Sequence, residues 1–363
     1  MDEHGERSWF AGALGHKHPF CHISALTVNP LASPHGGDAP ARSFWDRTGI
    51  SETRQSAWSS RSRVKAKYRV DLAVREIFMK SLLTILLFVP AVAGAQILVA
   101  GEGPVVYGHH HLNTTHMDAQ KKFYVDTLGG SLAKIGSGDR QQEIVKFPNV
   151  LIFFRPMQAP TGGSIGTTVN HIGFSVPDLR PLVAKIKANG FKMITADSVA
   201  ANVKVTDDIA AASPTTNLAF ALGPEDVKVE FVEVKSQKAP IQLHHIHFFG
   251  QMNTEMQAWY AKTFGATILA ANPGSAFVQD QLPGVFLNFT PSPTPTVGTT
   301  GRAIDHIGFE IKNLEAFTKN LEAQGIKLDR PYTKVPELGI AIAFIKDPWG
   351  TNIEMTEGLV NIK

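Results

Sequence analysis

Four short stretches of this 363-residue chain share a histidine-bearing pattern, and each reads as the first strand of a repeated unit. The two best copies are centred on His171, in V-N-H-I-G-F-S-V, and on His306, in A-I-D-H-I-G-F-E-I-K. Two looser copies, V-Y-G-H-H-H-L-N and Q-L-H-H-I-H-F-F, occupy residues 106–113 and 242–249. Because self-similarity at a fixed spacing is the signature of a repeat architecture, the pattern predicts four units that each begin with a strand.

The spacing of the histidines groups these units in pairs. From His109 to His171 is 62 positions, and the corresponding distance in the second half of the chain is 61. In each unit the first strand is followed by a helix-like run, a glycine and about three strand-like runs. One such unit has too little surface to bury both faces of its sheet, so units are expected to pair. We therefore predict an α+β fold of two tandem domains, 103–235 and 240–358, each made of two paired βαβββ units.

Net charge argues against a nucleic-acid partner. The formal charge of +3 is too small to indicate binding to a polyanion. A basic cluster at 61–69 is open to two interpretations, a basic patch or a solvated and unstructured segment, and the second is preferred. The expected partner is a small-molecule substrate, and the composition leaves the oligomeric state open.

Residues 79–95 have the features of a secretory signal peptide. Lys80 is followed by the apolar run S-L-L-T-I-L-L-F-V-P-A-V, and A-G-A comes before Gln96. The apolar run is short for a membrane span, and an uncleaved N-terminal anchor is the alternative. We therefore expect a mature chain that begins at Gln96, is periplasmic or secreted, and leaves the membrane after cleavage.

Residues 1–78 precede that segment and show no sustained periodicity. We expect them to be disordered or to belong to an over-extended reading frame, with Met79 as the true start. The only cysteine, Cys21, lies among them. The mature chain is therefore expected to have neither disulfides nor thiol chemistry.

Histidines and glutamates recur at matching points of the two predicted domains. In each domain two histidines open the paired units, and one glutamate lies on the last strand. Two imidazoles and a carboxylate on rigid strands form a facial ligand set that leaves positions open for substrate. Each residue alone is more often a packed or surface side chain, but the recurrence favours a divalent metal ion, without choosing among Fe2+, Mn2+, Zn2+ and Ni2+. The candidate ligands are His109, His171 and Glu230 in the first domain, and His245, His306 and Glu354 in the second.

Two further histidines are candidates for catalysis. His111 and His247 come two residues after His109 and His245, so they lie on the same face of their strands. They are predicted either to support the ligands or to transfer protons during catalysis. The alternative is a polar lining without a role.

Four motifs resemble those of the vicinal oxygen chelate (VOC) superfamily, the group of glyoxalases, bleomycin resistance proteins and extradiol dioxygenases. The resemblance covers essentially all of 103–358. It implies paired βαβββ modules that form an open, cupped sheet around a metal ion or ligand, and it assigns the metal to the same six candidate ligands. The motifs are N-H-I-G-F at 170–174, D-H-I-G-F at 305–309, K-F-Y-V-D-T-L-G at 122–129 and D-P-W-G-T-N-I-E-M at 347–355.

The sequence departs from the family patterns in three respects. Phe153 and Asn288 stand about where glyoxalase-type sites add a carboxylate. Phe344 and Phe220 stand where many ring-cleaving members carry a tyrosine, which argues against ring cleavage. The first domain has G-P-E-D where the second has D-P-W-G, so the second domain is the preferred candidate if only one site works.

Three functions follow from these observations. The leading hypothesis is a periplasmic or secreted metal-dependent enzyme, of the glyoxalase or dioxygenase type, whose metal ion binds two adjacent oxygens of a small substrate. The alternative is a metal-free protein that binds a small molecule, like bleomycin resistance proteins. The third is a structural or interaction protein with relict histidines, since fold alone does not decide function.

Overall fold

The computed structural model describes residues 103–156 and 158–362. The predicted signal segment at 79–95, the basic cluster and Cys21 lie outside the described residues. Within the described ranges, no helix combines the length and the apolar character that crossing a lipid bilayer requires.

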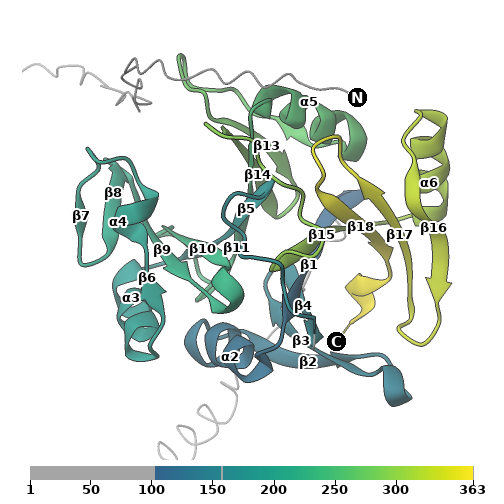
Figure 1. The fold of residues 1–363 in the computed structure, drawn as a ribbon, viewed down its shortest axis with the longest axis horizontal. Coiled ribbons are helices and arrows are strands. Elements are labelled where there is room, and N and C mark those ends of the chain that lie inside the picture. The colour runs from purple at the N-terminus through teal and green to yellow at the C-terminus, as the bar shows by residue number, and fades with distance from the viewer. Residues whose placement is uncertain (1–102, 157, 363) are drawn as a thin grey trace, which may run out of the picture. The chain divides into compact units, whose positions relative to one another are not determined.

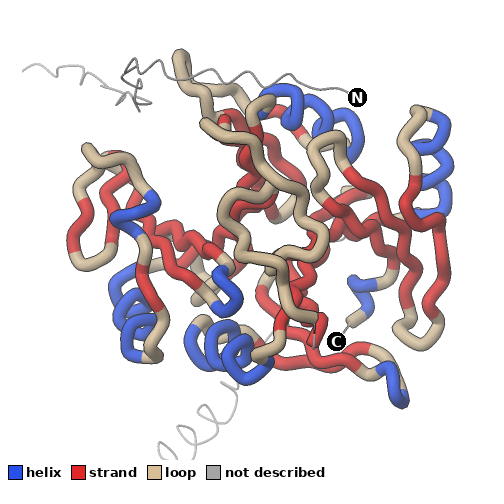
Figure 2. The backbone as a smooth tube through the Cα atoms, in the orientation of Figure 1, coloured by secondary structure: helices blue, strands red, loops and turns tan. Residues whose placement is uncertain are grey.

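Four modules with the order strand, helix and further strands follow one another along the chain (Figures 1 and 2). This confirms the α+β prediction and places His171 and His306 on strands, as expected. Module one contains β1 (Val105–Thr114), α2 (Met117–Lys121) with a π-helical continuation (Lys122–Thr127), β2 (Ser131–Ile135), β3 (Gln142–Phe147) and β4 (Val150–Pro156). Module two contains β5 (Val169–Val176), α3 (Leu179–Ala188), β6 (Lys192–Met193), α4 (Thr195–Ser198), β7 (Val205–Thr206), β8 (Ile209–Ser213), β9 (Thr216–Leu222) and β10 (Lys228–Glu233).

The third and fourth modules repeat this order with fewer additions. Module three contains β11 (Gln242–Gly250), α5 (Asn253–Phe264), β12 (Thr267–Ile268), β13 (Val278–Leu282) and β14 (Val285–Pro291). Module four contains β15 (Ile304–Ile311), α6 (Leu314–Ala323), β16 (Leu328–Val335), β17 (Ile340–Lys346) and β18 (Asn352–Glu357). Short 3-10 turns at Gly138–Arg140, Pro224–Asp226 and Leu359–Asn361 complete the described secondary structure.

Two of the helices show how the sequence sets their limits. Asp178 caps α3 by accepting a hydrogen bond from the Arg180 N–H, and Asn313 caps α6 by accepting one from the Ala316 N–H. The buried residues of α3 are Leu179, Val183 and Ile186, which recur at the helical period. Both helices therefore pack an apolar stripe against the sheet.

Two sheets carry the four modules, but the modules pair differently from the prediction. One sheet has the strand order β16-β17-β18-β15-β1-β4-β3-β2 and so joins module four to module one. The other has the order β12-β13-β14-β11-β5-β10-β9-β8-β7, with β6 beside β9, and joins module three to module two. The expectation that consecutive modules share a sheet is therefore wrong, whereas 103–235 and 240–358 stay predictions for the limits of the repeats.

The two long linkers explain how the chain changes sheets. The linker after module one and the linker before module four run side by side, since Thr167 and Val297 form a parallel bridge and Thr161 N donates to Gly301 O at 2.8 Å. The chain thus passes from one sheet to the other after β4 and returns before β15, while modules two and three stay together. The breaker-rich sequence of both linkers suits this path, because several of their backbone groups pair with each other.

The main core lies on the helix-bearing faces of the sheets. Phe264 at the end of α5 stacks on Phe309 of β15 with ring centroids 4.2 Å apart, and Phe147 of β3 lies 5.0 Å from Phe174 of β5. Both contacts join modules from different sheets. A second, smaller apolar cluster lies on the opposite face of β1 and β4 and includes Val106, Leu151 and Phe153.

The pairing of modules one and four can be tested by cysteine cross-linking. Val105 of β1 and Ile311 of β15 are directly opposed in the antiparallel ladder, at a separation of roughly 4.5–5.5 Å between Cα atoms that a disulfide can span. A Val105→Cys/Ile311→Cys chain, with Cys21→Ser, is expected to form an intramolecular disulfide. Mass spectrometry of the tryptic peptides under non-reducing conditions measures the bridge.

The matched control places the second cysteine where consecutive pairing would require it. Val176 holds the position in β5 that Ile311 holds in β15. Val105→Cys/Val176→Cys is expected to stay reduced, because these two strands lie in different sheets. A bridge in the control and none in the test pair would contradict the observed topology.

A buried carboxyl outside the histidine clusters predicts a pH-dependent stability. Burial raises the pKa of Asp280 on β13 to about 7, against a smaller opposing effect of the Gln257 amide. The unfolded chain loses this proton at about pH 3.9. Between that pH and about 7 the folded state binds more protons than the unfolded state, so the free energy of unfolding falls as pH rises. Asp280→Asn is expected to raise the free energy of unfolding by about 1–3 kcal/mol at pH 8 and by little at pH 4. Urea denaturation at both values, with the exposed Asp126→Asn as control, checks this; an equal gain at both would contradict it.

Candidate metal centres

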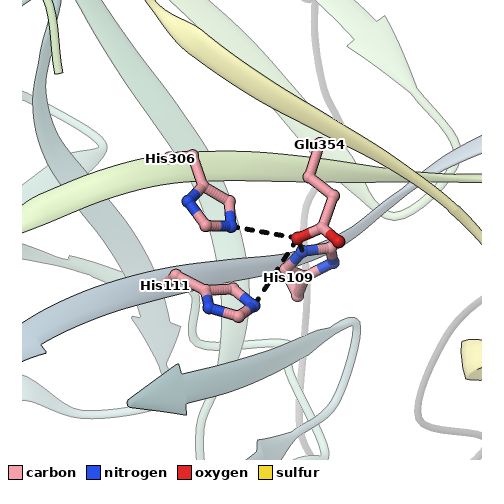
Figure 3. Close-up of side chains that lie close together, drawn as sticks. All are labelled: His109, His111, His306 and Glu354. Atoms are coloured by element: carbon pink, nitrogen blue, oxygen red, sulfur yellow. Dashed lines mark hydrogen bonds and ion pairs between the residues drawn. The ribbon is translucent and has the colours of Figure 1, made fainter. Parts of the chain in front are cut away.

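The first centre gathers three histidines and a glutamate from modules one and four (Figure 3). Glu354 Oε2 lies 3.0 Å from His109 Nε2, 3.0 Å from His306 Nε2 and 3.6 Å from His111 Nε2. His109 and His111 come from β1, His306 comes from β15 and Glu354 comes from β18. Three imidazole nitrogens therefore surround one carboxylate oxygen.

The second centre is the counterpart in modules two and three. Glu230 Oε2 lies 2.8 Å from His171 Nε2 and 3.2 Å from His245 Nε2. The fourth member, His247, has its Nδ1 atom 3.0 Å from His171 Nε2. The four ligand atoms of this group, like those of the first, all lie within 4.8 Å of one another.

These groups correct the predicted sets. All six predicted ligands lie in one centre or the other, but the first domain does not bring His109 to His171 and Glu230, and the second does not bring His245 to His306 and Glu354. Each centre instead takes one histidine strand from each repeat, because the sheets join module one to four and module two to three. His111 and His247 lie within the clusters rather than behind them.

A β-bulge and a glycine place the first histidine of each centre. The register of β1 against β15 shifts between Tyr107 and His109, and the extra residue turns His109 and His111 to the face that carries Glu354. His109 then lies opposite Gly308, whose own parallel partner is Glu354. The same shift occurs in β11, where His245 lies opposite Gly173 and Gly173 pairs with Glu230.

The glycine of each H-I-G-F motif is required by this close approach. A Cβ atom at Gly308 would lie 2.1 Å from His109 Cε1, and a Cβ atom at Gly173 would lie 2.1 Å from His245 Cε1. Any side chain at either position would push the imidazole away from its carboxylate. The motif therefore encodes space for a histidine that comes from a different module.

Burial and hydrogen bonding set the charges of the first centre. Burial lowers the pKa of His109, and it lowers the pKa of His111 well below the ordinary value, so both rings are neutral near pH 7. Burial also opposes protonation of His306, but hydrogen bonds to Asp305 and Glu354 outweigh it and raise the pKa. Burial alone would raise the pKa of Glu354, whereas its hydrogen bonds with His109 and His306 hold it well below the usual range.

The geometry of the first centre fits a divalent cation. Ligands at about 2.1 Å from a shared ion lie about 3.0–3.4 Å from one another in octahedral or tetrahedral arrangements. The separations of 3.0 Å from Glu354 Oε2 to His109 and His306 agree with that spacing, and the separation of 3.6 Å to His111 lies slightly beyond it. Neutral imidazoles and one ionised carboxylate are the donor types that Fe2+, Mn2+, Zn2+ and Ni2+ accept in proteins.

A carboxylate behind His306 supports this candidate ligand, and sequence reasoning missed it. Asp305 Oδ1 lies 2.7 Å from His306 Nδ1 and 3.0 Å from Arg155 Nη1. Such a carboxylate fixes the ring and its tautomer, so that Nε2 points to the metal position. The signal was present in the sequence as the difference between D-H-I-G-F and N-H-I-G-F, since Asn170 takes the same place beside His171 at 2.9 Å.

The remaining sequence candidates lie around the centres as packing groups. Phe153 of β4 stacks on the His111 ring with centroids 4.6 Å apart, and Phe344 of β17 meets the His306 ring edge-on at 5.5 Å. Phe220 lies 5.6 Å from the His171 ring in the second centre. Asn288 on β14 accepts a hydrogen bond from Gln279 at 2.7 Å. These positions therefore supply neither the second carboxylate nor the tyrosine of the related patterns.

The first centre opens on a cavity of about 220 Å³. His109, His111 and Glu354 form one side of it, and most of the remaining wall is aliphatic or aromatic. Two polar side chains with long reach, Gln142 and Arg330, also border the space. The other residues of the wall are Phe153, Val335, Leu338, Ile340, Ile342, Thr356 and Leu359.

Comparison with known proteins agrees with this architecture. A sequence model of the Glyoxalase/Bleomycin resistance protein/Dioxygenase superfamily matches residues 106–212 and 242–355, together more than half of the chain. The fold is similar to that of glyoxalase I from Zea mays, with a TM-score of 0.55, 16% identity and coverage of 71% of this chain and 94% of that one. It is also similar to a putative dioxygenase from Bacillus subtilis, with a TM-score of 0.54, 12% identity and coverage of 70% and 85%. At these identities the likeness concerns the fold alone, and no curated protein sequence matches the chain.

The close approach at the glycines predicts the effect of adding one methyl group. Gly308→Ala is expected to displace His109, to lower the free energy of unfolding by about 1–3 kcal/mol, and to weaken metal binding at the first centre. Denaturant unfolding and calorimetric metal titration measure the two effects. Gly173→Ala should destabilise the protein similarly while sparing the first centre, and unchanged metal binding in Gly308→Ala would contradict the assignment.

Proposed function

Because the chain belongs to the Glyoxalase/Bleomycin resistance protein/Dioxygenase superfamily, we propose that it is a metal-dependent enzyme acting on a small substrate through two adjacent oxygens. The observation that carries the proposal is the first centre, where three imidazole nitrogens surround Glu354 Oε2 at the edge of a cavity. The reaction is of the glyoxalase or dioxygenase type, which share the chelation of vicinal oxygens.

Three side chains hold the cation in this proposal. His109, His306 and Glu354 are nearly completely buried, and each comes from a strand at the middle of the sheet. Asp305 keeps the His306 ring in place from behind, and Gly308 leaves the room that the His109 ring occupies. A bound divalent cation would polarise the substrate oxygens and stabilise negative charge that develops on them.

His111 is the proposed proton acceptor. Its side chain is 17% exposed, more than those of His109, His306 and Glu354, and it borders the cavity. Its ring is held between Phe153 and His306, with centroids 4.6 and 4.2 Å away, so its nitrogens keep a fixed direction. Its lowered pKa means that the ring is neutral near pH 7, the form in which an imidazole can accept a proton.

The cavity supports a small substrate with an apolar body. Its volume of about 220 Å³ lies below the range of roughly 300–1,000 Å³ that is usual for drug-sized ligands. The aliphatic and aromatic wall suits an apolar body, while Arg330 and Gln142 offer hydrogen bonds at the rim. A metal-free binding protein is the second candidate, because the histidine contacts of Glu354 already satisfy that carboxylate without an ion.

The proposal predicts that the ligands and the proton acceptor respond differently to substitution. His306→Ala and Glu354→Gln are expected to weaken metal binding by about 100-fold or more, since each removes a donor or the only carboxylate charge. His111→Asn is expected to keep the metal while lowering kcat by about 10²–10⁴. Metal content after loading with Fe2+, Mn2+, Zn2+ or Ni2+ gives the first readout, and turnover of catechol and of a methylglyoxal–thiol hemithioacetal gives the second.

The outcomes separate the two candidate functions. A parent protein that takes up none of the four ions, yet gains thermal stability from a small aromatic ligand, would support the metal-free alternative. Metal binding that is equally tight in Glu354→Gln and in the parent would contradict the ligand assignment. Glu357→Gln, on the same strand, serves as a control that leaves the centre intact.

We also propose that the enzyme acts in the periplasm or outside the cell. The support is the signal-like sequence of residues 79–95, with its positive start, short apolar run and A-G-A end. Fractionation of native host cells and sequencing of the mature N-terminus test this placement. Protein found only in the cytoplasm would overturn it.

A further inference from the structure

We infer that the two histidine centres are unequal, and that the second centre does not hold a catalytic cation because Lys228 supplies a positive charge in its place. The inference rests on the proposed metal role of the first centre. Equivalent positions of the two centres differ in three ways, and all three differences disfavour a cation at Glu230.

The first difference is a buried ammonium group. Lys228 lies two residues before Glu230 on β10, so both side chains project from the same face of the strand. Lys228 is 9% exposed, and its Nζ atom lies 4.4 Å from the centroid of the Phe220 ring. That ring lies edge-on to the His171 ring at 5.6 Å, so the ammonium is one aromatic ring away from the ligands.

The first centre has no such cation at the matching position. Asn352 stands two residues before Glu354, where a neutral amide replaces the ammonium. A divalent ion approaching Glu230 would meet a like charge in a buried setting, where charges interact more strongly than in water. Lys228 places its positive charge on the strand face that carries Glu230, over the Phe220 ring.

The second difference lies behind the histidine that the H-I-G-F motif provides. His306 has the Asp305 carboxylate 2.7 Å from its Nδ1, whereas His171 has the neutral Asn170 amide oxygen at 2.9 Å. A carboxylate in this position raises the basicity of the ligand, and its loss typically costs about 10–100-fold in metal affinity. The second centre therefore lacks this carboxylate and has the Lys228 ammonium. Because Arg155 pairs with Asp305 in the first centre, the charged side chains of the two centres differ by one positive charge.

The third difference concerns the additional histidine. In the second centre both nitrogens of His247 are engaged, with Nδ1 3.0 Å from His171 Nε2 and Nε2 2.7 Å from Thr290 Oγ1. In the first centre the residue at the position of Thr290 is Arg155, which bonds Asp305 instead. His111 Nε2 thus faces Glu354 at 3.6 Å and remains available to the site.

Calorimetric titration of the chelator-treated full chain with Mn2+ and with Zn2+ tests the inference. The parent is expected to bind one ion tightly, and any second ion at least tenfold more weakly. His171→Ala is expected to keep the tight site, and His306→Ala to lose it. Circular dichroism and thermal unfolding show that each variant is folded.

Variants that are expected to gain metal binding at the second centre give the more decisive test. Lys228→Asn/Asn170→Asp introduces two of the three features of the first centre into the second and is expected to raise the stoichiometry from one ion to two. The reciprocal variant Asn352→Lys/Asp305→Asn is expected to weaken metal binding at the first centre by at least tenfold. The single variant Lys228→Met keeps the length of the side chain but removes its charge, and it is expected to strengthen metal binding at the second centre.

Each result has a defined reading. Two ions of equal affinity in the parent would overturn the inference and leave the proposed function intact. Loss of the tight site in His171→Ala would overturn it as well. The absence of any tight ion in the parent would overturn the proposed function together with the inference.

Discussion

The close contact between a histidine ring and a glycine at the middle of each sheet is the constraint on which the rest of the structure depends. His109 fits over Gly308, and His245 fits over Gly173, with no room for a Cβ atom between them. Because those glycines pair with Glu354 and Glu230 on the neighbouring parallel strands, the same contact brings each imidazole to its carboxylate. The central antiparallel pair of strands in each sheet thus joins two modules and also carries the histidines of one centre.

Burying these polar groups requires that their interactions be satisfied locally. An ionised carboxylate without partners in a core would be strongly unfavourable, and burial opposes the charge on Glu354 and on Glu230. Imidazoles of neighbouring strands solve this by pointing their nitrogens at the carboxylate. The arrangement is therefore stable as a hydrogen-bonded cluster, and its ligand spacing leaves it prepared for a cation.

The exchange of modules between the repeats makes the two centres interdependent. Each centre takes its histidines from both halves of the chain, so neither half contains a complete site. The linkers that carry the chain between sheets pair with each other through Thr167 and Val297. The two centres of one chain can carry different residues at equivalent positions. Asp305 corresponds to Asn170, and Asn352 corresponds to Lys228, so the two centres differ in charge.

The sequence by itself indicated the module, the histidine-bearing strands and the candidate ligands. Alternation and spacing alone indicated four strands with the H-x-H or H-I-G-F pattern and a helix with apolar residues at the helical period. They also indicated a glutamate on the last strand of each even-numbered module. Only the tertiary structure decided which modules pair. Every H-x-H strand offers a histidine and every H-I-G-F strand offers the glycine that receives it, so module one fits module two by the same local rule as it fits module four. That degeneracy is resolved by packing between sheets and by the path of the linkers, which involve contacts between residues far apart in the chain, and for this reason the ligand sets could not be assigned from sequence.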